Sequence, residues 1–431
     1  MKLAIVGGGW AGLGAAVRAV EAGHRVSVYE MAGQWGGRAR EVVVDGLALD
    51  NGQHILIGAY ARTLALMATL GIDASAALHR QPLELRYADG RGLRMPAGPA
   101  WLGFGAAALG CVGWNWRDKL AALGTAAGWA LHRFECPPHW TVDQLCRRLP
   151  PAVRQLLIDP LCVAALNTPA PQASAVVFLR VLRDALFSGR GSADLLLPRT
   201  SLGRLLPEPA VAWLQVRGAV LQLGSRVAAV DRAGDGWRIG EEAFDAIVLA
   251  CTAAEAARLA QPHAADWSLR ALGMAYEPIV TVYLQCPGGR LPSPMTALLE
   301  GADAPAQFAF DHGAVGATPG IFAFVVSGAR AWVDRGLAET GQAVLRQAVA
   351  VMPPGTWPRA PTVLRTMAEK RATFACTPLL QRPWQVIGPG LVAVGDYVEG
   401  PYPATLEGAL RSAEAAVAGM ATRAADLGLQ R

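Results

Sequence analysis

Lysine, and charge in general, are scarce in this sequence. Only Lys2, Lys119 and Lys370 are lysines among 431 residues, and Asp, Glu, Lys and Arg together make up 17% of the chain. Hydrophobic residues make up 52%, which excludes a disordered protein, because disordered chains are poor in apolar residues. The low charge content instead indicates extra apolar surface or an apolar cavity. The net charge of +5 is modest, and we expect no nucleic-acid partner.

Paired cysteines are also missing. The seven cysteines are dispersed, with no CxxC pair and no Cys/His cluster at the spacing of a zinc site. We therefore expect free thiols, mostly in the core, and no metal. The sequence begins with an apolar strand and lacks a basic segment followed by a cleavage site, so we expect a cytoplasmic protein without a signal peptide.

Three separated stretches have the apolar pattern of a nucleotide-binding fold. The expected elements are strand 2–7, helix 10–22 and strand 25–30, then strands 219–229 and 244–250, and finally strand 391–394 and helix 405–422. We interpret these stretches as one discontinuous Rossmann-like domain made of residues 1–70, 216–264 and 366–431. The two insertions, 71–215 and 265–365, are expected to form an α+β substrate domain. The predicted fold class is α/β.

A glycine motif marks a dinucleotide site between the first strand and the first helix. Gly7 permits a tight turn, Gly9 lets backbone N–H groups approach a pyrophosphate, and Gly12 lets the helix pack on the strand. Glu30 ends the next strand and is placed to accept the ribose hydroxyls. An acidic residue at this position disfavours the 2′-phosphate of NADP.

Further residues favour FAD over NAD. Gly37 and Arg38 supply a second flexible loop and a cation for the diphosphate. Asp396 follows the last strand, where a carboxylate can accept a hydrogen bond from a ribityl hydroxyl, which NAD lacks. The helix that begins near Thr405 directs its positive end at the reduced flavin. The predicted FAD contacts are Gly7, Gly9, Trp10, Ala11, Gly12, Glu30, Gly37, Arg38, Gly52, Gln53, His54, Val227, Gly395, Asp396, Thr405 and Leu406.

A stretch without charge occupies residues 95–116. Its length is sufficient to span a bilayer, but Pro96, Pro99 and five glycines argue against a continuous spanning helix. The surrounding region 76–150 has nine basic and five acidic residues and several tryptophans. Apolar and aromatic groups flanked by cations suit the anionic face of a membrane. A buried helical pair of the substrate domain is the alternative.

These motifs resemble a known family. The glycine motif with Glu30, Gly36-Gly37-Arg38 and Gly395-Asp396 resemble the flavin amine oxidase and phytoene desaturase superfamily. More specific segments along the whole chain are similar to the hydroxysqualene dehydroxylases, also called squalene-associated FAD-dependent desaturases. These segments are Asp50 to His54, Pro160 to Pro169, Leu195 to Pro198, Pro278 to Tyr283, Glu369 to Phe374 and Tyr402 to Gly408.

The resemblance implies a flavin amine oxidase-like fold and a reductive step of hopanoid biosynthesis. In that step reduced flavin replaces the hydroxyl of hydroxysqualene with a hydride and gives squalene. Such an enzyme requires an external electron donor and an apolar pocket for the lipid. We expect it to lie peripherally on the inner face of the cytoplasmic membrane, beside the synthase that precedes it in the pathway.

Three residues are candidates for a catalytic role. His54 matches the family's Asp-Asn-Gly-Gln-His motif and is the first candidate, as a proton donor or a flavin contact. A histidine held by the backbone is the alternative. Asp311 is the second candidate, but His312 follows it where the family pattern has arginine. Tyr402 is the third and, with Tyr283, could bind a hydroxyl or line the channel.

Three other functions are alternatives for the same fold and cofactor motifs. Oxidative desaturation of a polyprenyl chain uses the same cofactor motifs and differs in the direction of electron flow. Amine oxidation is disfavoured, because the chain has no lysine between Lys119 and Lys370 to stand near the flavin. In addition, Thr405 stands where amine oxidases have an aromatic residue. A non-catalytic isoprenoid carrier is a third possibility, and it predicts a colourless protein.

Overall fold

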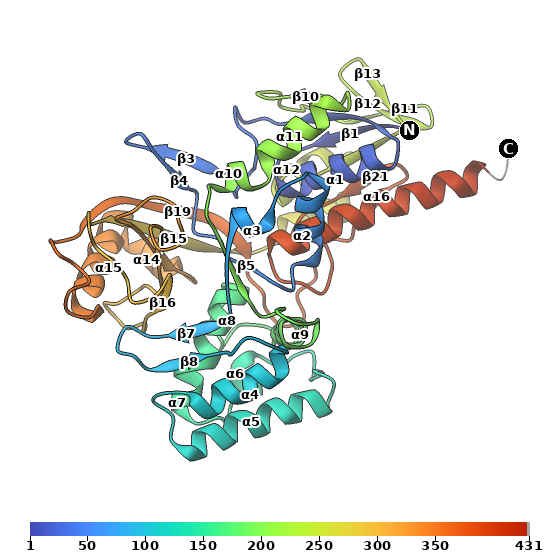
Figure 1. The fold of residues 1–431 in the computed structure, drawn as a ribbon. Coiled ribbons are helices and arrows are strands. Elements are labelled where there is room, and N and C mark those ends of the chain that lie inside the picture. The colour runs from blue at the N-terminus through green and yellow to red at the C-terminus, as the bar shows by residue number, and fades with distance from the viewer. Residues whose placement is uncertain (429–431) are drawn as a thin grey trace.

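A computed structural model describes residues 1–428 of the chain. Six strands form its main sheet, in the order β10-β2-β1-β14-β21-β20 (Figure 1). Their bounds are β1 Lys2–Val6, β2 Arg25–Tyr29, β10 Val220–Gln222, β14 Ala246–Leu249, β20 Val386–Gly388 and β21 Leu391–Ala393. Neighbouring strands are parallel except at the edge, where β20 pairs antiparallel with β21. The sheet takes two strands from each of three separated stretches, and the α/β fold class is confirmed.

Several helices share an apolar cluster with one face of this sheet. The longest of them are α1 Trp10–Glu21, α2 Ala61–Thr69, α11 Pro207–Val216 and α16 Leu406–Gly428. Glycine lets α1 lie close to α16, because a Cβ at Gly14 would meet the Leu410 side chain at 2.4 Å. Glu407 is buried and accepts hydrogen bonds from the backbone N–H and the hydroxyl of Thr63, both at 2.9 Å. These bonds fix the start of α2 to α16.

A second, antiparallel sheet has the order β16-β17-β18-β15-β19. Its strands are β15 Tyr276–Gln285, β16 Met295–Ala297, β17 Phe308–Asp311, β18 Ile321–Val326 and β19 Thr362–Phe374. The helices α14 Arg330–Arg335 and α15 Leu337–Val351 pack against it (Figure 1). The long strands β15 and β19 pair with each other and run from these helices toward the main sheet.

A helical lobe lies at the bottom of Figure 1. It contains α4 Ala100–Gly110, α5 Trp116–Leu131, α6 Val142–Leu145, α7 Pro151–Val153, a π-helix over Arg154–Ile158, α8 Asp159–Leu166 and α9 Ala175–Phe187, and the hairpin of β7 Glu84–Arg86 and β8 Gly92–Arg94 adjoins it. The uncharged stretch is therefore broken between α4 and α5. Asn115 makes the break, because its side chain caps α5 by accepting a hydrogen bond from the Arg117 N–H at 2.9 Å. No helix within residues 1–428 is both long and apolar enough to cross a membrane.

The remaining elements connect these units. They are the hairpin of β3 Glu41–Val44 and β4 Leu47–Asp50, the sheet of β5 Leu56–Ile57, β9 Leu195–Pro198 and β6 Leu78–Gln81, the meander of β11 Asp231–Ala233, β12 Gly236–Ile239 and β13 Glu242–Phe244, and the helices α3 Ala74–Ala77, α10 Leu202–Leu205, α12 Ala253–Ala260 and α13 Ala265–Leu272. All seven cysteines are free, and five of them are buried, as expected.

Three expectations about the fold need correction. The strand expected over 219–229 ends at Gln222, because the chain turns at Gly224, where φ is +65°. The domain limit expected after residue 365 falls inside β19, which pairs with β15 on both sides of that point. The limit expected after residue 215 falls inside the last turn of α11 and assigns α10 and most of α11 to the first insertion, although their apolar residues share a cluster with α1. We therefore propose that the nucleotide-binding unit includes α10 and α11 and that the second insertion extends through β19.

Candidate functional site

The glycine motif forms the turn that was expected. A Cβ at Gly7 would lie 2.6 Å from the carbonyl oxygen of Ala250, and Gly7 has a φ of +118° that other residues rarely adopt. A Cβ at Gly12 would lie 1.8 Å from the carbonyl oxygen of Gly7. α1 therefore packs directly on the turn. Gly9 is the N-cap of α1 and provides no side-chain cap, so the helix presents uncapped N–H groups to an anion.

Glu30 is held at the end of β2. Its carboxylate accepts hydrogen bonds from the Gly8 N–H at 2.7 Å and from the Ala32 N–H at 2.8 Å. The residue is buried beside the glycine turn, as a ribose-binding acid must be. Val227 is also buried, in the loop after β10, and its carbonyl accepts a hydrogen bond from Arg258 at 2.7 Å.

The second glycine loop meets the first. Gly36 and Gly9 form a β-bridge, and a Cβ at Gly37 would lie 3.1 Å from the Cα of Gly9. Arg38 continues this loop and makes an ion pair with Asp396 at 2.6 Å. The structure thus brings together two predicted cofactor residues that are 358 positions apart.

The loop after β4 holds His54 with its own backbone. His54 Nδ1 lies 2.9 Å from the carbonyl oxygen of Gly52, and because a carbonyl only accepts, Nδ1 must be protonated. Burial lowers the pKa of His54, and the charge of Arg38 acts in the same direction. The imidazole is therefore neutral at pH 7, and Nε2 is an acceptor. This state suits a contact with a ligand N–H or O–H and does not suit a proton donor, so the geometry favours the second of the two roles predicted for His54.

Asp311 is pinned by backbone groups. It is completely buried, and its two oxygens accept hydrogen bonds from the N–H groups of Leu291 and Ala314 at 3.1 and 3.0 Å. These bonds close the turn after β17, which gives Asp311 a structural task. The next residue, His312, donates from Nε2 to the Gln53 side-chain oxygen at 3.0 Å. Burial lowers the pKa of His312 to about 4, so a neutral histidine stands where the family pattern has a cation.

Tyr402 joins the loop before α16 to the helical lobe. Its hydroxyl donates to Asp184 at 2.6 Å and accepts a hydrogen bond from Arg180 at 3.2 Å. Both partners belong to α9, so the hydroxyl is already occupied by protein groups. Thr405 caps α16 by accepting a hydrogen bond from the Gly408 N–H at 3.0 Å, and Leu406 is the first helical residue.

Sequence patterns gave no indication of Arg382. Its guanidinium donates to five carbonyl oxygens of the loop between β21 and α16. They belong to Asp396, Tyr397, Val398, Gly400 and Tyr402. Burial lowers the pKa of Arg382, and the ring of Phe374 lies 4.7 Å from the guanidinium carbon. Arg382 belongs to no motif. Its partners are backbone carbonyls, which every residue has, so the residue types in the loop do not indicate the contact.

The residues present fit FAD. The uncapped start of α1 and the close approach of Gly9 and Gly37 form a cradle for a diphosphate. Thr281 on β15 is 1% exposed, and its hydroxyl has no hydrogen-bond partner among the described residues. A Cβ at Gly52 would lie 3.8 Å from that hydroxyl. An unpaired buried hydroxyl at this place is explained by a ligand that supplies its partner.

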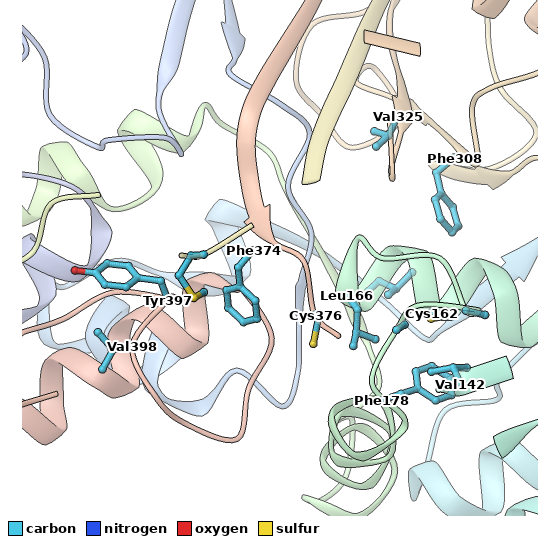
Figure 2. Close-up of a cluster of buried hydrophobic side chains, with 14 of the residues drawn as sticks. Val142, Cys162, Leu166, Phe178, Phe308, Val325, Phe374, Cys376, Tyr397 and Val398 are labelled. Atoms are coloured by element: carbon cyan, nitrogen blue, oxygen red, sulfur yellow. The ribbon is translucent and has the colours of Figure 1, made fainter. Parts of the chain in front are cut away.

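An apolar cluster leads from this site to the helical lobe. Figure 2 shows Phe374, Tyr397 and Val398 at one end of the cluster and Val142 and Phe178 at the other. A cavity of about 190 Å³ elsewhere in the structure is lined by several charged groups, so it does not correspond to the apolar channel that was expected.

Comparison with known proteins extends the resemblance to the whole chain. Residues 10–421 match the family described as flavin containing amine oxidoreductase. The chain is 29% identical over 448 residues to hydroxysqualene dehydroxylase of Rhodopseudomonas palustris, covering 98% of this chain and 97% of the relative. The same enzyme of Sinorhizobium fredii is also 29% identical, over 99% and 97%. A probable zeta-carotene desaturase of Synechococcus elongatus is 40% identical, but over 72 residues, 16% of this chain and 15% of the relative.

The solved structures agree on the fold. An oxidoreductase from Methanosarcina mazei superposes with a TM-score of 0.73 at 14% identity, covering 96% of this chain and 99% of that one. Identity this low supports the fold alone. The family match extends over nearly the whole chain, and it shows that the chain belongs to the flavin-containing amine oxidoreductase family and is an FAD-dependent oxidoreductase.

Proposed function

We propose that the protein reduces hydroxysqualene to squalene. The C–O bond of the alcohol breaks, the oxygen leaves as water after taking one proton, and the carbon takes a hydride. The observation that supports this reaction is the extent of the similarity, which covers nearly the full length of two hydroxysqualene dehydroxylases. The reaction consumes two electrons, and we propose that an external donor supplies them.

Each part of the site has a different proposed role. FAD, when bound, supplies the hydride in its reduced form. The glycine turn and the start of α1 bind the diphosphate, and Glu30 binds the ribose. Asp396 would bind the ribityl chain, and Arg38, which forms an ion pair with Asp396, would face the diphosphate. Neutral His54 would accept a hydrogen bond from the ligand. The apolar cluster from Tyr397 to the helical lobe excludes water from the reacting carbon.

One anaerobic experiment tests the reaction. Photoreduced enzyme is mixed with hydroxysqualene, and the products are separated by gas chromatography. We expect about one squalene per flavin, with oxidised flavin appearing at the same rate, while oxidised enzyme gives no squalene. A product with more double bonds than the substrate, formed by oxidised enzyme, would instead establish a desaturase.

Oxidative desaturation of a polyprenyl chain is the second candidate. It is favoured by the local similarity to zeta-carotene desaturases, which is higher in identity but limited to 72 residues. A desaturase releases electrons to an acceptor, so flavin reduction by a polyene substrate in the absence of any donor distinguishes it.

We also propose that the helical lobe lies on an anionic membrane surface and receives the insoluble substrate there, near the synthase that makes it. Trp116, Leu120 and Leu131 are each more than half exposed, and their spacing places them on one face of α5. Arg117 and Arg133 are exposed at the two ends of the same helix. Apolar side chains flanked by cations are typical of helices that lie in the plane of a membrane.

The aromatic residues of the uncharged stretch differ in exposure. Of the tryptophans in the uncharged stretch, Trp114 is 6% exposed, and its indole donates to the carbonyl of Ala152 at 3.2 Å. Trp114 is therefore a core residue of the lobe. Trp101 and Leu102 on α4 are exposed instead.

Replacing three residues of this surface tests the proposal. We expect the variant Trp116→Ser, Leu120→Ser and Leu131→Ser to lose at least tenfold in binding to phosphatidylglycerol vesicles, measured by cosedimentation, because about 1.5–3 kcal/mol of burial is lost at each side chain. The matched control replaces exposed apolar residues far from the lobe, namely Val216, Leu269 and Leu272, and it should bind like the unaltered protein. Equal losses in both variants would contradict a specific membrane face.

A further inference from the structure

A polar cavity of about 190 Å³ lies between the β3–β4 hairpin, the loop after β9 and the turn after β17. Its charged and polar lining includes Glu41, Asp50, Gln53, Arg199, Ser201, Arg204, Asp311 and His312. The first three come from the segment that leads into the FAD loop, and the last two from the substrate-domain sheet. The cavity therefore adjoins the seam between the two large units, next to the loop with Gly52 and His54.

Polar atoms in this lining lack protein partners. Glu41 Oε2 and Ser201 Oγ are buried, and neither has a hydrogen-bond partner among the described residues. Asp50 is 9% exposed, and one of its oxygens accepts a hydrogen bond from the Leu202 N–H at 2.8 Å. A cavity of this volume accommodates several water molecules, and a water needs two to four polar partners to stay bound. The unpaired atoms supply such partners, so the cavity is suited to hold water.

The other charged groups around Asp50 are accounted for. Arg199 donates to the carbonyl of Val315 at 2.8 Å and lies 3.3 Å from His79 Nδ1. Arg204, the second arginine of the lining, is exposed. Asp311 holds the turn after β17 and has Arg290 at 3.6 Å.

Asp50 itself makes no ion pair within the described residues. Burial raises the pKa of Asp50 to about 7, the Leu202 N–H opposes the rise, and the charge of Glu41 adds to it. Asp50 therefore changes its protonation state in the neutral range.

The backbone connects Asp50 to the site. Its carbonyl oxygen accepts a hydrogen bond from the Tyr283 hydroxyl at 3.0 Å, and the ring of Tyr283 packs edge-on against His312 at 5.8 Å. His312 in turn binds Gln53, one residue before His54. Burial lowers the pKa values of His54 and His312, so both are neutral, and Asp311 already accepts hydrogen bonds from two backbone N–H groups.

We propose that this cavity is a hydrated proton store for the reductive step, in which Asp50 takes up a proton from water and releases it toward the hydroxyl that leaves the substrate. This inference rests on the proposed dehydroxylation, which consumes one proton for each hydroxyl lost as water. Asp50 is then protonated before each turnover and ionised after it, and cavity water restores the proton from bulk solvent. Asp50 acts through water and is not itself in contact with the reacting carbon.

The test combines a spectroscopic and a kinetic measurement. Infrared difference titration of the FAD-loaded protein should show a protonated carboxyl band that disappears with a midpoint near pH 7, and Asp50→Asn should remove this band. Single-turnover formation of squalene should slow as the pH rises through the same midpoint. In Asp50→Asn we expect a rate at least tenfold lower at pH 6.5 and no inflection near pH 7.

Two further variants keep the test decisive. Glu41→Gln removes the neighbouring charge and should move both midpoints to lower pH while the protein stays folded and flavin-loaded. Glu135→Gln changes an exposed carboxylate on the helical lobe and should alter neither. Squalene formation with an unchanged pH profile in Asp50→Asn would overturn the role of Asp50 and leave the proposed function intact. Unaltered enzyme that makes no squalene would overturn the proposed function and this role together.

Discussion

Gly9→Val is expected to give a folded protein that binds no FAD. A Cβ at Gly9 would meet nothing closer than the Cα of Gly37 at 3.7 Å, so the fold has room for the side chain. The backbone of Gly9 is extended, with φ at −78°, and valine tolerates this conformation. Its methyl groups, however, fill the space in front of α1 where a diphosphate must approach the N–H groups. We expect flavin absorbance below a tenth of the unaltered level and a thermal midpoint close to that of the unaltered apoprotein.

Two glycine controls separate loss of the cofactor from loss of the fold. Gly33→Val lies in the same loop region with nothing within 4 Å of its Cβ, and it should retain FAD. Gly12→Ala places a Cβ 1.8 Å from the Gly7 carbonyl oxygen, and it should fail to fold even though it adds only one methyl group. A stoichiometric flavin content in Gly9→Val would show that the diphosphate does not bind at this turn.

The glycine turn expected at the cofactor was predictable because its residues are required by local backbone geometry. Gly7 and Gly12 are required by contacts within a strand, a turn and a helix that follow one another directly, so the spacing alone specifies them. The pairing of Arg38 with Asp396 was not predicted, although each residue was expected separately at the cofactor. The sheet order then brings the two side chains together.

The catalytic candidates were harder to judge from the sequence, because their partners lie far away in the chain. Tyr402 binds Asp184, 218 residues earlier, and Asp311 binds two backbone N–H groups. A motif shows which residue types are present but not whether their polar atoms are already occupied. Asp50 lines its cavity together with Glu41, its partner across the β3–β4 hairpin, and Ser201, which lies in the loop after β9. Contacts between distant parts of the chain depend on how those parts pack, and no periodic sequence pattern indicates them.

The domain limits are difficult to place from the sequence for a similar reason. β19 is polar on one side and only half-buried over much of its length, so its sequence does not distinguish the edge of the substrate sheet from a connection between domains. Pairing with β15 decides the assignment. The helices α10 and α11 also carry no nucleotide-binding motif, and only their contacts with α1 show that they belong to the first unit.

Arg382→Ala is expected to destabilise the protein strongly and to release FAD. The guanidinium is the shared donor for five carbonyls of the loop that contains Asp396 and precedes α16. Removing it leaves buried acceptors unpaired, each at a cost of about 1–3 kcal/mol that does not add fully. We expect the free energy of unfolding to fall by about 3–5 kcal/mol, measured by urea denaturation of both apoproteins followed through tryptophan fluorescence, and the flavin absorbance of the purified variant to be lost.

Lysine at the same position tests the role of geometry. Arg382→Lys keeps the charge, but one ammonium group cannot reach carbonyls that are spread over seven residues, so most of the loss should remain. If only the charge of Arg382 mattered, Arg382→Lys would behave like the unaltered protein and the loop would keep its FAD. Arg270→Ala is the matched control, since this arginine also stacks on an aromatic ring, Trp384, but bonds no backbone of the loop. A small effect there, with a large one in both Arg382 variants, would establish that a single side chain sets the shape of the loop on which Asp396 and the start of α16 depend.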